Sequence, residues 1–174
     1  MHYLITGHTG FKGAWLALML TQRGHTVSGL ALDPAPGSLY ERVRLSTLLR
    51  RDLRVDIRDA RATLQAIVAL EPEVVLHLAA QPLVRESYRD PRATYETNTL
   101  GTLNVLMAVE ATSSVQAQVI ITTDKVYRNV NQIWGYRESD PLGGVDPYST
   151  SKAAADLITQ SWMRTSGSGV PTAI

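Results

Sequence analysis

Short apolar runs and longer amphipathic segments alternate along the chain. Six runs are typical of strands buried on both faces, and they cover residues 2–6, 26–32, 53–57, 74–78, 119–122 and 171–174. The segments between them place apolar residues at helical spacing, at 12–23, 39–49, 60–70, 91–111 and 148–165. This alternation predicts an α/β fold, a doubly wound parallel sheet of the Rossmann type.

Residues that favour helix ends support these boundaries. Asp59 is expected to cap its helix, and Asp90-Pro91 and Asp146-Pro147 each place proline at the start of a helix. Gly24 is expected to end the first helix. The apolar residues at helical spacing in that helix are Trp15, Leu16, Met19 and Leu20.

Composition narrows the class of protein. The 174 residues can bury a sizeable core as one domain. A formal net charge of +1, with 19% charged residues, gives no reason to expect a nucleic acid as partner. Without cysteine there is no disulfide, thiol nucleophile or thiolate metal site, and we expect no metal. No leader pattern or bilayer-length apolar run occurs, so we expect a soluble cytoplasmic protein with no membrane partner.

A glycine cluster follows the first expected strand and opens the first helix. Gly7, Gly10 and Gly13 allow a backbone to approach a pyrophosphate, whose charge the helix N-terminus would meet. The spacing is G-x-x-G-x-x-G, so this pattern alone is weak. Asp33 lies twenty residues after Gly13, where a carboxylate binds the ribose of NAD and repels a 2′-phosphate. The alternative for Asp33 is a loop-start residue before Pro34.

A second group of polar residues follows the fifth expected strand. Tyr148 and Lys152 are four residues apart and share one face of a helix, where the ammonium would favour the phenolate and make it a general base. The alternative is a surface tyrosine and lysine on an ordinary helix. Thr123, Asp124 and Lys125 come directly after the apolar run, at the edge where open α/β sheets bind ligands.

Weaker signals point to the same cofactor. Asp56-Ile57 follows the third strand and is placed to contact adenine, although a plain strand-end aspartate fits equally well. Ala79 and Ala80 are small, as a cofactor lying across the sheet edge requires. Asn98 is a mediocre helix former, which indicates a role near the site or a bend. His77 is interpreted as a core histidine.

The motifs taken together resemble the extended short-chain dehydrogenase/reductase family. The matching segments are Thr6–Gly13, His77–Pro82, Thr97–Thr102 and the Tyr148/Lys152 pair. Within the family the chain is most similar to sugar-nucleotide 4,6-dehydratases that act on CDP-glucose, through Thr123–Lys125, Trp134–Glu138, Asp140–Gly144 and Asp146–Tyr148. The likeness covers essentially the whole chain.

The resemblance implies a reaction and a cofactor, NAD. Tyr148 would take the C4 hydroxyl proton of CDP-glucose while hydride passes to NAD, with Lys152 supporting it and Thr123 binding the C4 oxygen. Lys125 as base and Asp124 as acid would then remove water across C5–C6. The implied cofactor contacts are Gly7, Thr9, Gly10, Phe11, Gly13, Asp33, Asp56, Ile57, Leu78, Ala79, Ala80, Asn98, Tyr148 and Lys152.

Three functional classes remain open. The first is this dehydratase, and the second is a 4-epimerase or dehydrogenase of the same family, which needs no acid/base pair after the fifth strand. The third is a non-catalytic NAD-binding fragment, because the chain stops inside the sixth expected strand and family members continue into a substrate domain. We expect one NAD-binding domain, 1–174, that forms a homodimer through the helices starting near Pro91 and Tyr148 and has little activity alone.

Overall fold

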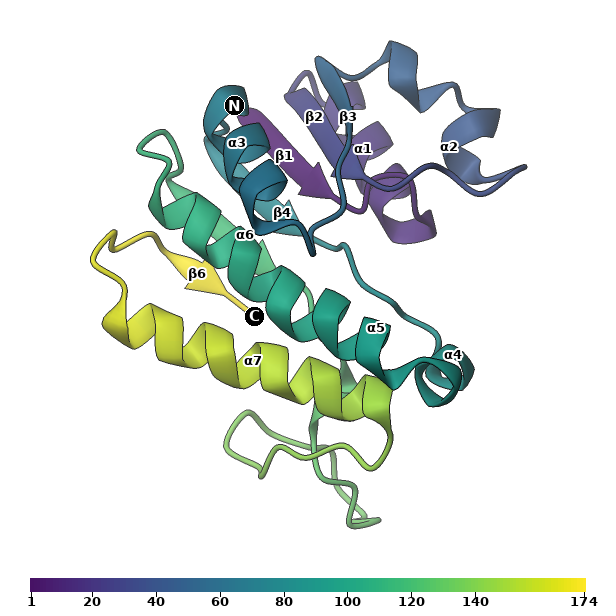
Figure 1. Ribbon diagram of the computed structural model, residues 1–174, viewed down its shortest axis with the longest axis vertical. Helices are drawn as coiled ribbons and strands as arrows, with labels where there is room; N and C mark the ends of the chain where they lie inside the picture. The colour runs from purple at the N-terminus through teal and green to yellow at the C-terminus, as the bar shows by residue number, and fades with distance from the viewer.

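Six parallel strands form one sheet in the order β3-β2-β1-β4-β5-β6. The computed structural model describes residues 1–174 (Figure 1). The strands are β1 (His2–Thr6), β2 (Thr26–Ala31), β3 (Arg51–Arg54), β4 (Val74–His77), β5 (Ala117–Ile120) and β6 (Thr172–Ala173). The order reverses between β1 and β4, so the predicted doubly wound fold is confirmed. Sheets of this kind bind ligands where the order reverses.

Seven α-helices connect the strands. They are α1 (Phe11–Gln22), α2 (Leu39–Arg42), α3 (Ala60–Leu70), α4 (Val84–Arg89), α5 (Pro91–Tyr95), α6 (Gly101–Glu110) and α7 (Pro147–Thr165). A π-helical turn, Glu96–Leu100, joins α5 to α6, and short 3₁₀ turns occupy Leu45–Thr47 and Asp124–Val126. No helix has both the length and the apolar character needed to cross a membrane.

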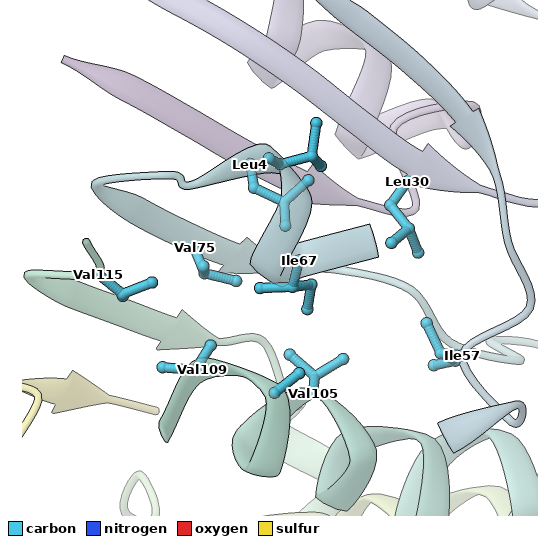
Figure 2. Packing of buried hydrophobic residues seen from close by; sticks show 10 residues of the cluster. Leu4, Leu30, Ile57, Ile67, Val75, Val105, Val109 and Val115 are labelled. Carbon is cyan, nitrogen blue, oxygen red and sulfur yellow. The ribbon is translucent and has the colours of Figure 1, made fainter. Parts of the chain in front are cut away.

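Two apolar cores form on opposite faces of the sheet, because neighbouring residues of a strand point to opposite sides. Leu4 of β1 belongs to a cluster of ten buried residues with α3 and α6, in which Ile67, Val105 and Val109 meet the sheet (Figure 2). Ile5, the next residue, packs instead into the smaller cluster with α1 and α2. Each fully buried side chain of this size stabilises the fold by roughly 1.5–3 kcal/mol.

The predicted helix starts are confirmed by their capping bonds. The side chains of Asp59, Asp90 and Asp146 accept hydrogen bonds from backbone N–H groups three residues ahead, at 2.9, 2.9 and 3.0 Å. Gly24, which follows the last turn of α1, has a φ of +79°, a value that L side chains rarely adopt.

The buried face of α1 differs from what apolar spacing indicates. Trp15 and Met19 are 46% and 43% exposed, whereas the fully buried positions are Gly13, Ala14 and Ala17. Small residues on this face let the helix lie close to the sheet, and large side chains there would hold it away. Leu16 and Leu20 of the expected stripe do pack against the core, so hydrophobicity alone identifies only part of the buried face of this helix.

Several boundaries also differ from the sequence prediction. The expected helix 39–49 is broken, because Arg44 adopts a left-handed φ of +50°. β3 begins two residues earlier than expected, at Arg51, where its pairing with β2 starts. It stops at Arg54, which pairs with Ala31, the last residue of β2. β5 likewise begins and ends two residues early. The prediction missed α4 and the π-helical turn within the long helix.

A buried hydrogen-bond chain joins β1, β4 and α6. The Thr6 hydroxyl oxygen accepts from the N–H groups of Leu78 and Ala79, both at 3.1 Å, so its own proton is free for His77 Nδ1 at 2.7 Å. The Thr102 hydroxyl donates to the Asn98 carbonyl and so accepts from His77 Nε2, 3.0 Å away. His77 is therefore a satisfied core residue, and its imidazole carries the proton on Nε2.

Burial of His77 makes stability depend on pH. Desolvation and the nearby positive charge of Lys152 lower the pKa of His77 from 6.5 to about 3. Between these values the unfolded chain binds a proton that the folded chain does not, so stability is full above pH 6.5 and falls as pH decreases. The slope from this residue is about 1.4 kcal/mol per pH unit.

We predict that His77→Gln flattens this dependence, because an amide does not titrate. Urea unfolding between pH 7 and pH 5 should show a shallower loss of stability in the variant than in the wild type. His25→Gln, at a partly buried position just before β2, is the matched control for removing an imidazole elsewhere in the chain. Identical slopes for His77→Gln and wild type would show that His77 is not the group responsible.

Candidate functional site

The glycine loop is fitted tightly between β4 and α1. Gly7 has a φ of +74°, and a Cβ there would lie 2.8 Å from the Cα of Ala79. A Cβ on Gly13, in the first turn of α1, would overlap the carbonyl oxygen of Gly7. Gly10 is exposed and precedes α1 without a side-chain cap. The first N–H groups of α1 therefore lie free along this loop, as an anion-binding helix start requires.

A cleft of about 750 Å³ runs along the carboxyl ends of the strands beside this loop. It lies where the strand order reverses, and its walls come from the glycine loop, the segments after β2 to β5, and the start of α7. Twelve of the residues singled out in the sequence line it: Gly7, Thr9, Gly10, Phe11, Gly13, Asp56, Ile57, Leu78, Ala79, Ala80, Tyr148 and Lys152. Segments distant in sequence thus form one continuous wall.

Tyr148 and Lys152 stand one turn apart on α7 and both line the cleft. Lys152 is buried, and its Nζ donates a hydrogen bond of 2.9 Å to the Ile121 carbonyl at the end of β5. Burial and the positive charge of Lys12 lower the pKa of Lys152 to about 8. The structure thus holds a buried cation in the same cleft wall as the Tyr148 side chain, one helical turn away along α7.

Five predicted residues do not line the cleft. Thr123 lies just beyond Thr122 and caps the 3₁₀ turn that contains Asp124 and Lys125, and the Thr123 hydroxyl donates to the Asp124 carboxylate at 3.0 Å. Asp33 follows β2 and its side chain is 90% exposed. Asn98 is fully buried.

Asn98 connects two walls of the cleft. Its amide accepts from the N–H of Gln81 at 2.8 Å and donates to the carbonyl of the same residue and to the Ser151 hydroxyl, at 3.0 and 2.9 Å. The loop after β4 is thereby tied to the helix that carries Tyr148. Asn98 therefore lies behind the cleft wall and not in it.

Sequence reasoning missed other lining residues, among them Lys12 and Arg58. Arg58 donates hydrogen bonds to the Asp56 carboxylate from Nε at 2.9 Å and from Nη2 at 2.6 Å. These bonds lower the pKa of Asp56. The sequence signal that could have identified Arg58 is its position two residues after Asp56 in a turn, which allows the two side chains to pair. Lys12 lies inside the glycine motif itself.

Comparison with known proteins places the chain in a family. Residues 4–174 match the family model described as GDP-mannose 4,6 dehydratase. The chain belongs to the GDP-mannose 4,6-dehydratase family. It is 49% identical over 159 residues to a CDP-glucose 4,6-dehydratase of Salmonella typhimurium, a match that covers 91% of this chain and 44% of the relative. The chain thus spans about half the length of the curated relatives it matches.

Solved structures resemble this family member closely. DesIV from Streptomyces venezuelae, a dTDP-glucose 4,6-dehydratase with NAD and TYD bound, has a TM-score of 0.82 and 28% identity, over 99% of this chain and 54% of that one. A Thermus thermophilus UDP-glucose 4-epimerase in complex with NAD has a TM-score of 0.84 and 31% identity, over 96% and 52%. Both dehydratases and epimerases of the extended family therefore share this fold.

The cleft has the features that a dinucleotide needs. Gly7 and Gly13 allow a close turn that no side chain would fit, and the uncapped start of α1 offers N–H groups to a pyrophosphate. Leu32, Val55 and Ile57 supply an apolar surface at one end, and Tyr148 and Lys152 supply polar groups at the other.

We predict that Gly13→Ala destabilises the chain by about 1–3 kcal/mol, because its methyl group would force the glycine loop to shift. The displaced loop should also bind NAD more weakly. Gly135→Ala is the matched control, since nothing lies within 4 Å of a Cβ there. Thermal unfolding and calorimetric titration with NAD measure both effects. If the two variants had the same thermal stability and the same affinity for NAD, the glycine loop would have space for the added methyl group, which would contradict the prediction.

Proposed function

We propose that this chain is the NAD-binding half of a sugar-nucleotide 4,6-dehydratase whose substrate is CDP-glucose. The observation that carries the proposal is the position of the Tyr148/Lys152 pair in a glycine-lined cleft, with Thr123, Asp124 and Lys125 directly beyond it. The identity of 49% to the Salmonella typhimurium enzyme supports the choice of CDP-glucose.

The cleft residues are proposed to hold NAD. The glycine loop and the start of α1 bind the pyrophosphate, Asp33 binds the adenine-side ribose, and Asp56 with Ile57 contacts the adenine. Ala79 and Ala80 leave space across the sheet edge, and Lys152 binds the second ribose. When bound, NAD accepts hydride from C4 of the hexose and returns it to C6, so no external reductant is consumed.

Tyr148 is the proposed base for the C4 hydroxyl. Its oxygen takes the hydroxyl proton as the carbon is oxidised, and the Lys152 ammonium stabilises the phenolate. The Ile121 carbonyl holds Lys152 in place for this role, 2.9 Å from Nζ. Thr123 binds the C4 oxygen, which requires its hydroxyl to turn away from the Asp124 carboxylate.

Asp124 and Lys125 are proposed to carry out the elimination. A ketone at C4 acidifies the C5 proton, which Lys125 removes as a neutral amine, while Asp124 as a neutral acid protonates the leaving C6 hydroxyl. Both side chains are exposed in this chain. Bound substrate and the remaining half of the enzyme would bury them, and burial favours the neutral form of each.

The alternative function is 4-epimerisation, favoured by the likeness to a UDP-glucose 4-epimerase at 31% identity. That reaction uses a tyrosine and lysine pair but includes no elimination, so Asp124 and Lys125 would have no catalytic role in it. A non-catalytic NAD-binding role is the third candidate function. The mass of the product separates these possibilities.

The test uses this chain alone and fused in frame to the C-terminal half of the Salmonella typhimurium relative. With CDP-glucose and NAD, we expect the fusion to yield a product lighter by one water, and the chain alone to react slowly or not at all because remote substrate contacts position the hexose. An isomer of unchanged mass would support epimerisation. No reaction by the fusion would contradict both activities.

In the fusion, Lys125→Ala should stop elimination after C4 oxidation, so reduced nicotinamide should accumulate and be visible in its absorbance. The expected loss in product formation is about 10²–10⁴-fold, as for other general bases. Arg128→Ala, an exposed cation three residues further along the chain, is the matched control and should retain activity. Product formation at the wild-type rate by Lys125→Ala would remove Lys125 from its role.

We also propose a homodimer through the surface of α5, α6 and α7. These helices lie side by side (Figure 1). Leu100 of the π-helical turn, Met107 of α6 and Leu157 of α7 are more than half exposed, and an apolar surface of this kind favours association. Light scattering should show self-association of the chain that Leu157→Glu weakens. Leu64→Glu, at an exposed position on α3, should not weaken it. A monomeric wild type would contradict the proposal.

A further inference from the structure

A polar cluster connects the glycine loop to β3. His8, between Gly7 and Thr9, is fully buried, and its Nε2 lies 2.7 Å from Asp52 Oδ1. Tyr40 donates a hydrogen bond to the other oxygen of Asp52. Arg54 binds both oxygens of this carboxylate, through Nη1 at 2.6 Å and Nη2 at 3.1 Å, and also donates to Tyr40 at 2.8 Å.

The charges in this cluster cancel. Burial would raise the pKa of Asp52, but hydrogen bonds from Arg54, Tyr40 and His8 outweigh burial and lower it. Burial lowers the pKa of His8 despite its bond to Asp52. At neutral pH the Asp52 carboxylate is therefore ionised and His8 is neutral, so Asp52 balances the charge of Arg54.

The remaining edge of the Arg54 guanidinium faces Asp33. Arg54 Nε lies 3.2 Å from Asp33 Oδ1, just after the end of β2. The preceding residue, Leu32, lines the cleft, and its carbonyl accepts a hydrogen bond of 3.0 Å from Thr9 of the glycine loop. The guanidinium thus lies next to the cleft-lining residue Val55, just outside the cleft, and each of its nitrogens is within 3.2 Å of a carboxylate oxygen.

We infer that Arg54 is a masked phosphate-binding residue, and that Asp33 selects NAD over NADP partly by keeping it masked. The inference rests on the proposed NAD site. Asp33 then acts twice: its charge repels a 2′-phosphate, and it occupies the guanidinium edge that would bind one. Arg54, Asp52 and Asp33 together carry a net charge of −1, which a 2′-phosphate would meet on entering.

Removal of the Asp33 charge should make the Arg54 guanidinium available to a 2′-phosphate. In Asp33→Asn the nearby charges sum to zero, and Arg54 Nε is released from its ion pair. An exposed guanidinium edge is a good partner for phosphate, because its N–H groups form charge-assisted hydrogen bonds. Any gain in NADP binding should therefore depend on Arg54 and not only on the loss of repulsion.

The experiment is a calorimetric titration of the 174-residue chain with NAD and with NADP. Wild type should prefer NAD by at least about tenfold, and Asp33→Asn should bind NADP at least about tenfold more tightly than wild type, as one charge-assisted bond allows. Arg54→Gln, added to Asp33→Asn, should cancel most of that gain. Arg51→Gln, added instead, removes a charge from the same strand without contacting Asp33 and should leave the gain intact.

The outcomes separate the inference from the proposed function. If the wild type binds neither nucleotide, both are overturned. If it binds NAD but the NADP gain persists in Asp33→Asn/Arg54→Gln, or never arises in Asp33→Asn, only the inference is overturned. Should Arg54→Gln not fold, Arg54→Lys replaces it; lysine lacks the planar fork, so the gain should fall, and an undiminished gain would overturn the inference.

Discussion

The Thr6 hydroxyl is the contact on which the geometry of the cleft depends. It sits at the carboxyl end of β1 and accepts hydrogen bonds from two consecutive N–H groups just past the end of β4. These bonds fix the distance between the two strands at the point where the order of the sheet reverses. Gly7 then follows with so little space that its Cα hydrogen faces the Ala79 backbone directly. The floor and one wall of the cleft are therefore set by one side chain and the residue after it.

Features that depend on residues close in sequence were predictable. The glycine spacing, the four-residue interval of Tyr148 and Lys152, and the aspartate caps are all set within one or two helical turns, and the structure contains each of them. The strand ends of β3 and β5 were displaced because they depend on which residues of the neighbouring strand they pair with. The buried face of α1 was only partly predictable from hydrophobicity: Leu16 and Leu20 pack against the core, but close approach to the sheet selects small side chains at its fully buried positions.

Hydrogen bonds between residues far apart in the sequence limited how much of the site could be predicted. Nothing in the local sequence indicates that Asn98 joins Gln81 to Ser151, which is 53 residues away, or that Asp52 holds His8 of the glycine loop. Polar residues of this kind stabilise the fold only when all their partners are present, since a buried amide without partners costs about 1–3 kcal/mol. The roles assigned to Thr123 and to the exposed Asp124 and Lys125 rest on the resemblance and the chemistry.

The π-helical turn at Glu96–Leu100 constrains how this segment can change over time. The wider turn accommodates one residue more than a regular helix would, and Asn98 lies within it. Loss of a single residue there would restore a regular turn and leave the flanking turns in phase, because the wider turn takes up the extra residue within one revolution. Side chains inside the turn would still be displaced, and Asn98, which contacts both Gln81 and Ser151, is one of them. The extra residue and the contacts of Asn98 therefore form a unit, and a lineage could lose them together far more readily than one at a time.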